Sequence, residues 1–555
     1  MPLNHAEDTP KPDLCSRFEQ AVNLYPNQIA FKAEGGLGKA YRFDEVLQTV
    51  RAVAAGLVGR GCIDDCGIGI LSENRPEWPI AYLSILAAGG TVVPIDINLK
   101  PTEVAHIVKH SQLRSAFVSS RGRELLDDVA VNVEMFSFED DSSSGWTELA
   151  SSEPLMPLPP PSEVAVIIYT SGTTGAPKAV ELTHKNLLAN LDGIFSRLSI
   201  GPEDVFLSVL PLHHTFEASC GFLTPIMSGA TIVYARSLKS NQIKEDIANN
   251  RVTYMVGVPL LFEKMYQSFQ RKLATAPVLR RLIFRTLMSL SSATWKLGLK
   301  SGRSLFRSVR NRAGLGSVRI FVSGGAAIPP KMARFFNLFG LDFLEGYGMT
   351  ECSPVISFQR PDDIKFGSVG PPLDNVEVRI DTPGADGVGE IIVKGDNITP
   401  GYRGLPKETA ELVVDGWLHT GDLGRIRDGH LWITGRRKSL IVSAAGKNIY
   451  PEELEEKLIE SPLILEAVVF GRAKEGRQGD EVRALIVPDL EQLVAYELIA
   501  TVDNPDLATI NTTVAHVVRQ LNDNVGAYKR IAAFDVQLDE LEKTSTRKIK
   551  RFLYK

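Results

Sequence analysis

Short apolar runs rich in β-branched residues alternate with stretches of helical periodicity along most of the chain. The clearest runs are "GIGIL" (67–71), "GTVVPI" (90–95), "VAVIIYT" (164–170), "ATIVYA" (230–235), "VTYMVGV" (252–258) and "VRIFVSG" (318–324). Continuous apolar runs of this length are typical of strands that are buried on both faces of a parallel sheet. The alternation therefore predicts an α/β fold with mostly parallel sheets flanked by helices.

The pattern changes after "GHLWITGRRKSLIV" (429–442). Beyond it, "YPEELEEKLIE" (450–460) has the composition and period of a helix, while "AVVFGR" (467–472) and "VRALIVPD" (482–489) are strand candidates. The chain is therefore expected to join two domains through the basic turn "GRRKS". These are a large N-terminal domain, residues 1–436, and a small α+β C-terminal domain, residues 437–555.

Residues 264–319 break the alternation with thirteen Lys/Arg and no Asp or Glu, which predicts a basic helical insertion. On a wheel of ~100° per residue, one face of the segment 278–290 carries Leu279, Leu282, Ile283, Leu287 and Leu290. The other side carries Arg280, Arg281 and Arg285. An apolar face with uniform positive charge is typical of a helix that lies on an anionic bilayer. A helix packed on the core with a solvated basic face would show the same pattern.

The composition limits the classes of protein to which the chain can belong. Of 555 residues, 44% are apolar and 23% are charged, as in globular proteins, and the net charge of −5 argues against a general nucleic-acid binder. The five cysteines are scattered and no histidine completes a zinc site, which predicts a reducing compartment. No run approaches the ~20 apolar residues of a membrane span, and residues 1–30 lack a secretory signal. We expect a cytoplasmic protein that at most lies on the inner face of the membrane.

A glycine-rich segment, "YTSGTTGAPK" (169–178), follows a predicted surface loop at 139–161 and a buried strand. Its glycines let backbone N–H groups converge on an anion, and its hydroxyls and lysine add donors. The expected phosphate-binding residues are Thr170, Ser171, Gly172, Thr173, Thr174, Gly175 and Lys178. In a Walker loop serine or threonine would follow the lysine, whereas Ala179 follows Lys178, and a helix is expected to begin near Thr183. A flexible polar linker is the alternative interpretation.

Six further segments accompany this loop in a fixed order. They are "LPLHH" (210–214), "VSGGAAIPP" (322–330), "EGYGMTE" (345–351), "GWLHTGDLG" (416–424), "GRRKSLIVSAAGKNIYPEELE" (435–455) and "TSTRKIKR" (544–551). Together they resemble the adenylate-forming superfamily of acyl-CoA synthetases, luciferases and adenylation domains over nearly the whole chain. The resemblance implies that ATP activates a carboxylic acid as an acyl-adenylate and that coenzyme A then displaces AMP. It also implies Mg²⁺ as a cofactor and a mobile C-terminal domain.

The resemblance gives roles to residues of the N-terminal domain. Residues 170–178 would hold pyrophosphate, and the adenine would lie against Gly324, Gly325, Ala326, Gly346, Tyr347 and Gly348. Thr350 would bind phosphate and Glu351 would bind Mg²⁺, a hard cation that prefers oxygen ligands. A lone glutamate is otherwise most often a solvated surface charge. His213 and His214 would border the acyl group, and we expect one of them to be structural because neighbours on a strand point to opposite faces.

The remaining roles fall at the C-terminal end of the chain. Asp422 and Arg436 would bind the ribose, although Asp422 could instead be a turn residue. Lys548 matches the adenylation lysine that bridges the carboxylate and the α-phosphate, with a plain basic tail as the alternative. Arg547 replaces the usual glycine before it. Lys438 would be the hinge, followed by Ser439 where relatives have aspartate, and Gly446 would line the thiol tunnel.

The substrate class follows from the insertion. Residues 264–319 resemble those of long-chain fatty-acyl-CoA synthetases, which implies a fatty-acid substrate and an anionic membrane surface as a partner. An aryl- or medium-chain acyl-CoA ligase and a ligase that loads a carrier protein are the nearest alternatives. A non-catalytic scaffold that binds nucleotide and membrane is a third, although the complete set of site residues argues against it. The sequence predicts no nucleic-acid partner and leaves the oligomeric state open.

Overall fold

The computed structural model describes residues 13–33, 39–63, 67–129, 132–139, 145–150, 158–170, 177–443, 446–473, 479–543 and 549–554. The chain forms two compact units. Unit 1 comprises Met1–Glu377 and Lys394–Leu418, and unit 2 comprises Val378–Val393 and His419–Lys555. The division into domains 1–436 and 437–555 remains a prediction. The two units are defined by contacts between residues, so they do not test where the predicted domains begin and end.

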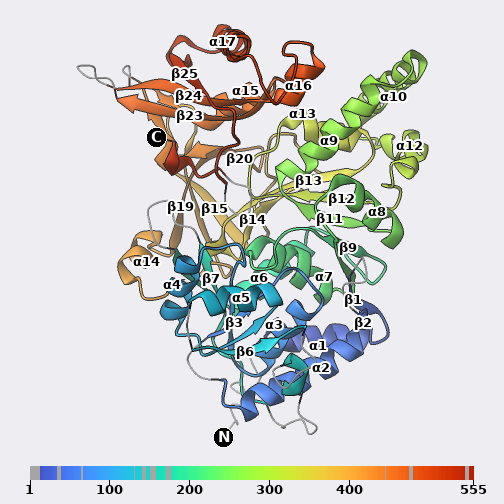
Figure 1. Cartoon of the computed structure of the whole chain (residues 1–555), viewed down its shortest axis with the longest axis vertical. Helices are drawn as coiled ribbons and strands as arrows, with labels where there is room; N and C mark the ends of the chain where they lie inside the picture. Colours follow the sequence, from blue (N-terminus) through green and yellow to red (C-terminus); the bar gives the residue numbers. More distant parts are fainter. Residues whose placement is uncertain are drawn as a thin grey trace, which may run out of the picture. The chain divides into compact units, whose positions relative to one another are not determined.

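An eight-stranded sheet occupies one part of unit 1 (Figure 1). Its order is β14 (Val355–Phe358), β13 (Asp342–Gly348), β12 (Ile320–Ser323), β11 (Tyr254–Gly257), β9 (Val205–Ser208), β10 (Thr231–Tyr234), β1 (Ile29–Ala33) and β2 (Tyr41–Arg42). All neighbours are parallel except the pairs at the two edges, β13–β14 and β1–β2. The central strands β10, β11 and β12 are fully buried, as their apolar runs predicted.

A seven-stranded sheet forms the other part of unit 1. Its order is β17 (Gly401–Tyr402), β8 (Lys178–Thr183), β7 (Val164–Thr170), β4 (Thr91–Pro94), β3 (Gly67–Leu71), β5 (Ser115–Val118) and β6 (Glu134–Ser137). The strands from β7 to β6 are parallel neighbours, and β8 runs antiparallel to both β7 and β17. The predicted α/β fold with mostly parallel sheets is confirmed.

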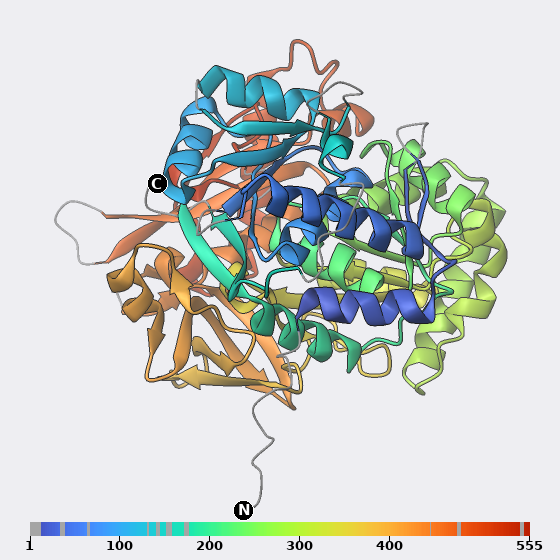
Figure 2. The same cartoon turned by 90° about the horizontal axis from the view of Figure 1, so that it is seen from below.

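Helices cover these sheets. Helix α1 (Leu14–Leu24) packs on α2 (Phe43–Gly59) and α6 (His184–Phe195), and the blue helices α1 and α2 lie side by side (Figures 1 and 2). Helix α6 begins after the N-cap Thr183, as predicted. In the core beside β11–β13, the ring of Phe262 lies 5.3 Å from that of Phe321 and 5.0 Å from that of Phe343, measured between centroids.

Two segments differ from what the sequence predicted. No element was predicted for Lys178–Thr183, between the loop and the helix, but it forms strand β8, because its alternating "KAVELT" pattern suits a strand that is paired with both β7 and β17. Within the predicted surface loop at 139–161, Trp146–Leu149 forms a short 3₁₀ helix in which Trp146 and Leu149 are buried. The ring of Trp146 packs edge-on against Phe138, so apolar contact overrides the polar composition of the segment.

The insertion 264–319 is helical, as predicted. It contains α10 (Val278–Trp295), α11 (Gly302–Leu305) and α12 (Arg307–Arg312), and it begins within α9 (Pro259–Ala274). These helices gather beside α13 (Pro330–Leu338) in Figure 1. Among the described residues, no helix combines the length and the apolar character that crossing a bilayer requires.

Helix α10 has apolar side chains on two opposite faces. Phe284, Leu287 and Met288 pack against the core. The outer face carries Leu279, Leu282, Ile283 and Leu290, with exposed fractions of 67%, 61%, 50% and 49%. The expectation that Leu287 belongs to the outer stripe is therefore wrong, because its position on the wheel lies at the border of the core side. Helix α10 therefore packs on the core with one face and presents an exposed apolar stripe on the other.

Unit 2 contains the other sheets. Strands β15 (Val376–Asp381), β16 (Gly389–Gly395), β19 (Trp417–Arg427) and β20 (His430–Arg436) lie in one sheet, to which β18 (Val413–Val414) adds an edge within unit 1. A three-stranded sheet holds β23 (Ile464–Ala473), β24 (Asp480–Pro488) and β25 (Ala533–Val536), packed with α15 (Pro451–Ile459) and α17 (Leu507–Asp523). The helix and both strands predicted after residue 449 are present.

One of the basic residues of the insertion is buried. Arg310 is 5% exposed and donates from Nη1 to the carbonyl oxygens of Phe339 (3.1 Å) and Gly302 (3.3 Å). Its Nη2 donates to the carbonyl oxygen of Arg303 (2.8 Å). Carbonyl dipoles therefore surround this guanidinium, and it ties the insertion to the end of α13.

Replacing Arg310 with alanine is expected to lower the free energy of unfolding by about 2–4 kcal/mol, because buried carbonyl groups lose charged donors. Urea unfolding followed by tryptophan fluorescence measures the change. The matched control is Arg285→Ala on the exposed side of α10, for which a change within about 0.5 kcal/mol is expected. Equal losses in the two variants would contradict a structural role for Arg310.

Candidate functional site

The segment 345–351 passes very close to its antiparallel neighbour. A Cβ on Gly348 would lie 1.9 Å from the carbonyl oxygen of Pro354, and one on Gly346 would lie 2.9 Å from the ring of Phe358. Only glycine fits such approaches. Tyr347 lies between them and is half-buried. Because both glycines allow a close approach of the neighbouring backbone and ring, β13 can lead directly into the turn that follows.

That turn, Thr350–Cys352, is held by two buried asparagines. Asn190 in α6 donates to the carbonyl oxygen of Val355 (2.8 Å), and Asn397 donates to that of Cys352 (2.9 Å). Sequence reasoning missed both, because they lie far from the turn in the chain and no local pattern marks them. Buried amides that satisfy backbone carbonyls in this way fix the position of the turn.

Glu351 projects from this turn and is 9% exposed. The hydroxyl of Tyr402 donates to its Oε1 (2.7 Å), and the N–H of Thr399 donates to its backbone oxygen (2.9 Å). Burial, followed by the charge of Glu351, raises the pKa of Tyr402, so its hydroxyl stays a donor at neutral pH. Tyr402 is a third residue that the sequence did not indicate.

The donor set around Glu351 suits Mg²⁺ bound together with phosphates. No group of three or more His, Cys, Asp or Glu that could hold a metal occurs among the described residues. Mg²⁺ keeps several waters and needs only one or two carboxylates when substrate phosphates complete its shell. A single, nearly buried glutamate therefore fits the expected Mg²⁺ ligand, and thiol- or imidazole-rich metal sites do not fit.

The two ends of the phosphate loop lie in a β-ladder. Thr170 ends β7 and is paired with Lys178 at the start of β8, and its Oγ1 donates to the carbonyl oxygen of Lys178 (3.4 Å). The ammonium of Lys178 lies over the ring of Tyr402, 4.5 Å from its centroid. Tyr402 therefore contacts both Lys178 and Glu351. Ser171, Gly172, Thr173, Thr174 and Gly175 lie outside the described residues.

The predicted adenine wall follows β12. Gly324 is buried, and a Cβ there would lie 2.8 Å from the ring of Phe216. Gly325 has a φ of +84°, which favours glycine, and both Gly325 and Ala326 are exposed. The segment thus offers a flat, largely backbone surface, as a planar ring requires.

The two histidines lie in a turn after β9, so the argument from strand geometry was wrong. The rings of His213 and His214 are in contact, with centroids 4.4 Å apart. Nε2 of His213 lies 3.4 Å from Oδ2 of Asp96, and both side chains are nearly buried. Asn74 anchors this turn by accepting from the N–H of Leu212 (3.0 Å).

In unit 2, Asp422 and Arg436 face each other across strands β19 and β20, with Nε of Arg436 2.9 Å from Oδ1 of Asp422. Asp422 is 5% exposed. The ion pair places an acceptor carboxylate where Arg436 fixes its orientation. This arrangement is compatible with both the ribose-binding role and the turn role.

Glu390 organises the loop beside this pair and was not predicted. It accepts from the N–H of Gly421 (3.0 Å), from Nδ1 of His419 (3.2 Å) and from Nη1 of Arg437 (2.7 Å). Burial raises the pKa of Glu390, but these donors outweigh burial and lower it overall. Gly421 has a φ of +71°, so the turn before Asp422 needs glycine.

The predicted hinge and thiol-tunnel residues follow directly. Lys438 is exposed in a 3₁₀ turn, Arg437–Ser439. Gly446, with a φ of +69°, closes the hairpin of β21 (Ile441–Val442) and β22 (Asn448–Ile449). The roles of both residues remain predictions.

Lys548 lies outside the described residues, but its flanks are anchored. Lys543 forms ion pairs with Glu466 and Glu540, and Arg551 forms one with Glu455. The described residues on either side are therefore not a solvated basic tail.

Comparisons with known proteins show which family the chain matches. The AMP-binding enzyme family matches residues 18–403, and the AMP-binding enzyme C-terminal domain matches residues 453–548. The long-chain-fatty-acid–CoA ligase FadD15 of Mycobacterium bovis is 31% identical over 91% of this chain and 89% of its own length. The sulfoacetate–CoA ligase of Cupriavidus necator is 30% identical over 90% of this chain and 88% of its own length. The anthranilate CoA ligase AuaEII in complex with anthranoyl-AMP shares the fold, with a TM-score of 0.78 and 21% identity over 99% of this chain and 98% of its own.

Replacing Gly348 with alanine is expected to lower the free energy of unfolding of unit 1 by about 1–3 kcal/mol, because the new methyl group meets a backbone oxygen. Thermal unfolding followed by circular dichroism measures the change. Gly201→Ala is the control, since its Cβ meets only the side-chain end of Glu203. If Gly348→Ala unfolds at the wild-type midpoint, the close approach does not constrain the turn.

Proposed function

Because this chain belongs to the AMP-binding enzyme family, we propose that it activates a carboxylic acid with ATP and transfers the acyl group to coenzyme A. The observation that carries the proposal is the arrangement at the ends of the phosphate loop. Lys178, over the ring of Tyr402, supplies a cation there, and the nearly buried Glu351, bonded to the hydroxyl of Tyr402, supplies an acceptor for a hard metal. Such a pair suits a magnesium-bound triphosphate.

In the first half-reaction a carboxylate oxygen of the acid attacks the α-phosphorus, and the bond to pyrophosphate breaks. We assign residues 170–178 to the β- and γ-phosphates and Lys548 to the contact between the carboxylate and the α-phosphate. Glu351 would hold Mg²⁺, which would supply positive charge for the departing pyrophosphate. Asp422 and Arg436 are assigned to the ribose and Tyr347 to the adenine.

In the second half-reaction the sulfur of coenzyme A attacks the acyl carbonyl carbon. The bond between the carbonyl and AMP breaks, and the thiol proton is released. Lys438 is assigned as the hinge and Gly446 to the thiol path, and His214 is assigned to the acid pocket. His213, which lies against Asp96, is assigned a structural role.

The proposed acid is a long-chain fatty acid. The name of the Mycobacterium bovis relative supports this class, and the apolar outer face of α10 is a feature of proteins that meet lipid. The name of the relative from Cupriavidus necator, a sulfoacetate–CoA ligase, instead favours a small polar acid. A small polar acid is therefore the competing substrate class.

We also propose that α10 rests on an anionic membrane surface. Its exposed leucines and isoleucine form one stripe, and Arg281 and Arg285 lie on the other side of the wheel. Since the insertion holds no acidic residue, anionic lipid is the complementary partner.

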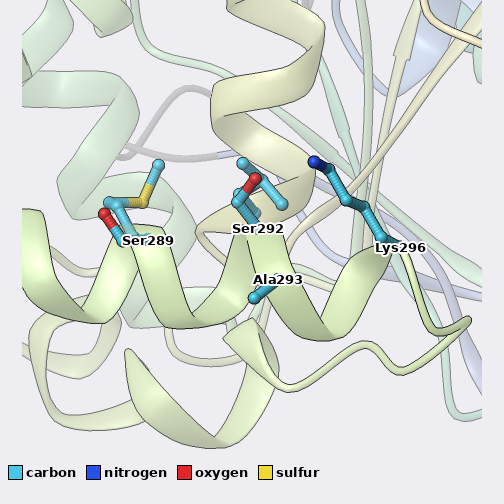
Figure 3. Close-up of a pocket in the computed structure, with 6 residues that line it drawn as sticks. Ser289, Ser292, Ala293 and Lys296 are labelled. Atoms are coloured by element: carbon cyan, nitrogen blue, oxygen red, sulfur yellow. The ribbon is translucent and has the colours of Figure 1, made fainter.

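A hollow of about 380 Å³ adjoins the same helix (Figure 3). It is lined by Met288, Ser289, Ser292, Ala293, Lys296 and Leu338. Figure 3 shows Ser289, Ser292 and Lys296 projecting from the same side of α10. Arg334 donates to the hydroxyl of Ser292 (2.9 Å) and adds a second cation. Polar, cationic surface next to an apolar stripe suits the headgroup level of a bilayer.

With a series of acids, kcat/KM for pyrophosphate release is expected to rise roughly fourfold per buried methylene and to peak at ~C12–C18, well above acetate, benzoate and sulfoacetate. AMP release should require coenzyme A.

Lys548→Ala should abolish acyl-adenylate formation, whereas the matched control Lys550→Ala, which removes a lysine that pairs with Glu542, should retain it. A best substrate that is short, aromatic or sulfonated would overturn the fatty-acid assignment, and no adenylate with any acid would overturn the function.

Binding to vesicles of phosphatidylglycerol and phosphatidylcholine is expected to weaken at least ~10-fold when Leu279 and Leu282 are both replaced by glutamine, because two apolar anchors are lost. Co-sedimentation measures the bound fraction. The control changes Leu24 and Leu507, which are similarly exposed elsewhere, to glutamine. Equal binding of both variants, or binding that does not depend on anionic lipid, would contradict the membrane proposal.

A further inference from the structure

Tyr402 is fixed in place by its backbone rather than by its ring. In strand β17 it is paired with Val180 of β8, and its N–H donates to Oγ1 of Thr409 (3.0 Å). Gly401 before it has a φ of +146°, and a Cβ there would lie 2.3 Å from the methyl group of Thr409. The backbone of Tyr402 is therefore held by β8 and by Thr409. These contacts fix the direction in which the side chain projects.

Within the part of the chain that the structure describes, the hydroxyl of Tyr402 has one hydrogen-bond partner, Glu351. It donates to Oε1 of Glu351 at 2.7 Å, and the two residues are also linked through Thr399, whose N–H donates to the carbonyl of Glu351. Thr399 in turn donates from its hydroxyl to the carbonyl oxygens of Glu181 (2.5 Å) and Gly401 (3.1 Å). A charge-assisted bond of this length restricts rotation of the carboxylate and occupies one of its oxygens. The other oxygen is then the one presented to a cation.

The ring of Tyr402 has a separate partner. The ammonium of Lys178 lies 4.5 Å from the ring centroid, within the range of cation–π attraction. Lys178 begins β8, the strand with which Tyr402 is paired, so the ladder holds the two residues in register. One aromatic ring thus contacts a cation on its face and an anion at its hydroxyl.

We propose that Tyr402 is a positioning residue that holds Glu351 for Mg²⁺ through its hydroxyl and Lys178 for the β- and γ-phosphates through its ring. The inference rests on the proposed function, since it assumes that these two side chains receive magnesium and phosphate. Tyr402 itself contacts neither. Its hydroxyl and its ring act on different partners, so the two effects separate in suitable variants.

Binding of α,β-methylene-ATP, measured by isothermal titration calorimetry with Mg²⁺ and with EDTA, tests this role. In Tyr402→Phe the ring remains and the hydroxyl is lost, so the Kd with Mg²⁺ should rise roughly 5- to 30-fold, while the Kd in EDTA stays within about twofold. In Tyr402→Leu the Kd in EDTA should also rise, roughly 3- to 10-fold, because Lys178 loses the ring. Tyr254→Phe, which removes a hydroxyl bond to the carbonyl oxygen of Ser199 (2.9 Å) in the same unit, should change neither value.

A double-mutant cycle separates positioning from a general loss of structure. In a Glu351→Gln background, Tyr402→Phe should no longer change the Mg²⁺-dependent gain in affinity. In a Lys178→Met background, Tyr402→Leu should resemble Tyr402→Phe. Additive effects in both backgrounds, or an unchanged Mg²⁺-dependent gain in Tyr402→Phe, would overturn the positioning role.

The binding experiment needs no acid and no turnover, so it is independent of the ligase assay. If the wild type binds the analogue but forms no acyl-adenylate, the proposed function fails and the Tyr402 result stands. If the acid assay succeeds while Tyr402→Phe keeps its full Mg²⁺-dependent gain, only the positioning role fails. A wild type that binds no analogue overturns both.

Discussion

The carboxylate that we propose as the Mg²⁺ ligand, Glu351, has to be held in one position, and the backbone of residues 349–355 does this. The turn carrying Glu351 is tied by Asn190 from a helix and by Asn397 from a distant loop, both through buried amide groups. Gly348 lets the turn lie against Pro354 with no side chain between them. Since unsatisfied buried carbonyls are costly, these bonds resist any displacement of the turn. The position of one anionic group thus depends on the two sheets of unit 1 and the helix α6.

The fold and the order of the chemical segments were predictable because both are encoded locally. A buried parallel strand is a continuous apolar run, and the runs at 67–71 and 164–170 match β3 and β7 at both ends. Glu351, Asp422 and Lys178 were proposed as site residues because each lies in a short segment that resembles the adenylate-forming superfamily. Their surroundings were not predictable. Tyr402 meets Lys178 only because β17 pairs with β8, and Glu390 accepts from donors on one strand, β19, and on the turn that carries Arg437.

Helix α10 shows a different limit of sequence reasoning. A helical wheel reports that apolar residues share a face, but it cannot tell a face that packs from one that remains exposed. In α10 the two kinds lie opposite each other, with Phe284 turned to the core and Leu282 to the outside. The same limit applies to charged residues. The position of Arg310 in a basic segment did not show whether its guanidinium is buried and structural or solvated.

The bond from Arg437 to Glu390 has a mechanical consequence for the turn that follows. Arg437 is bound by this carboxylate, which also accepts from the N–H of the glycine before Asp422. Lys438, the proposed hinge, follows Arg437 directly. A rotation at this position would therefore begin beside a guanidinium bound to β16, and it would have to keep or break that bond.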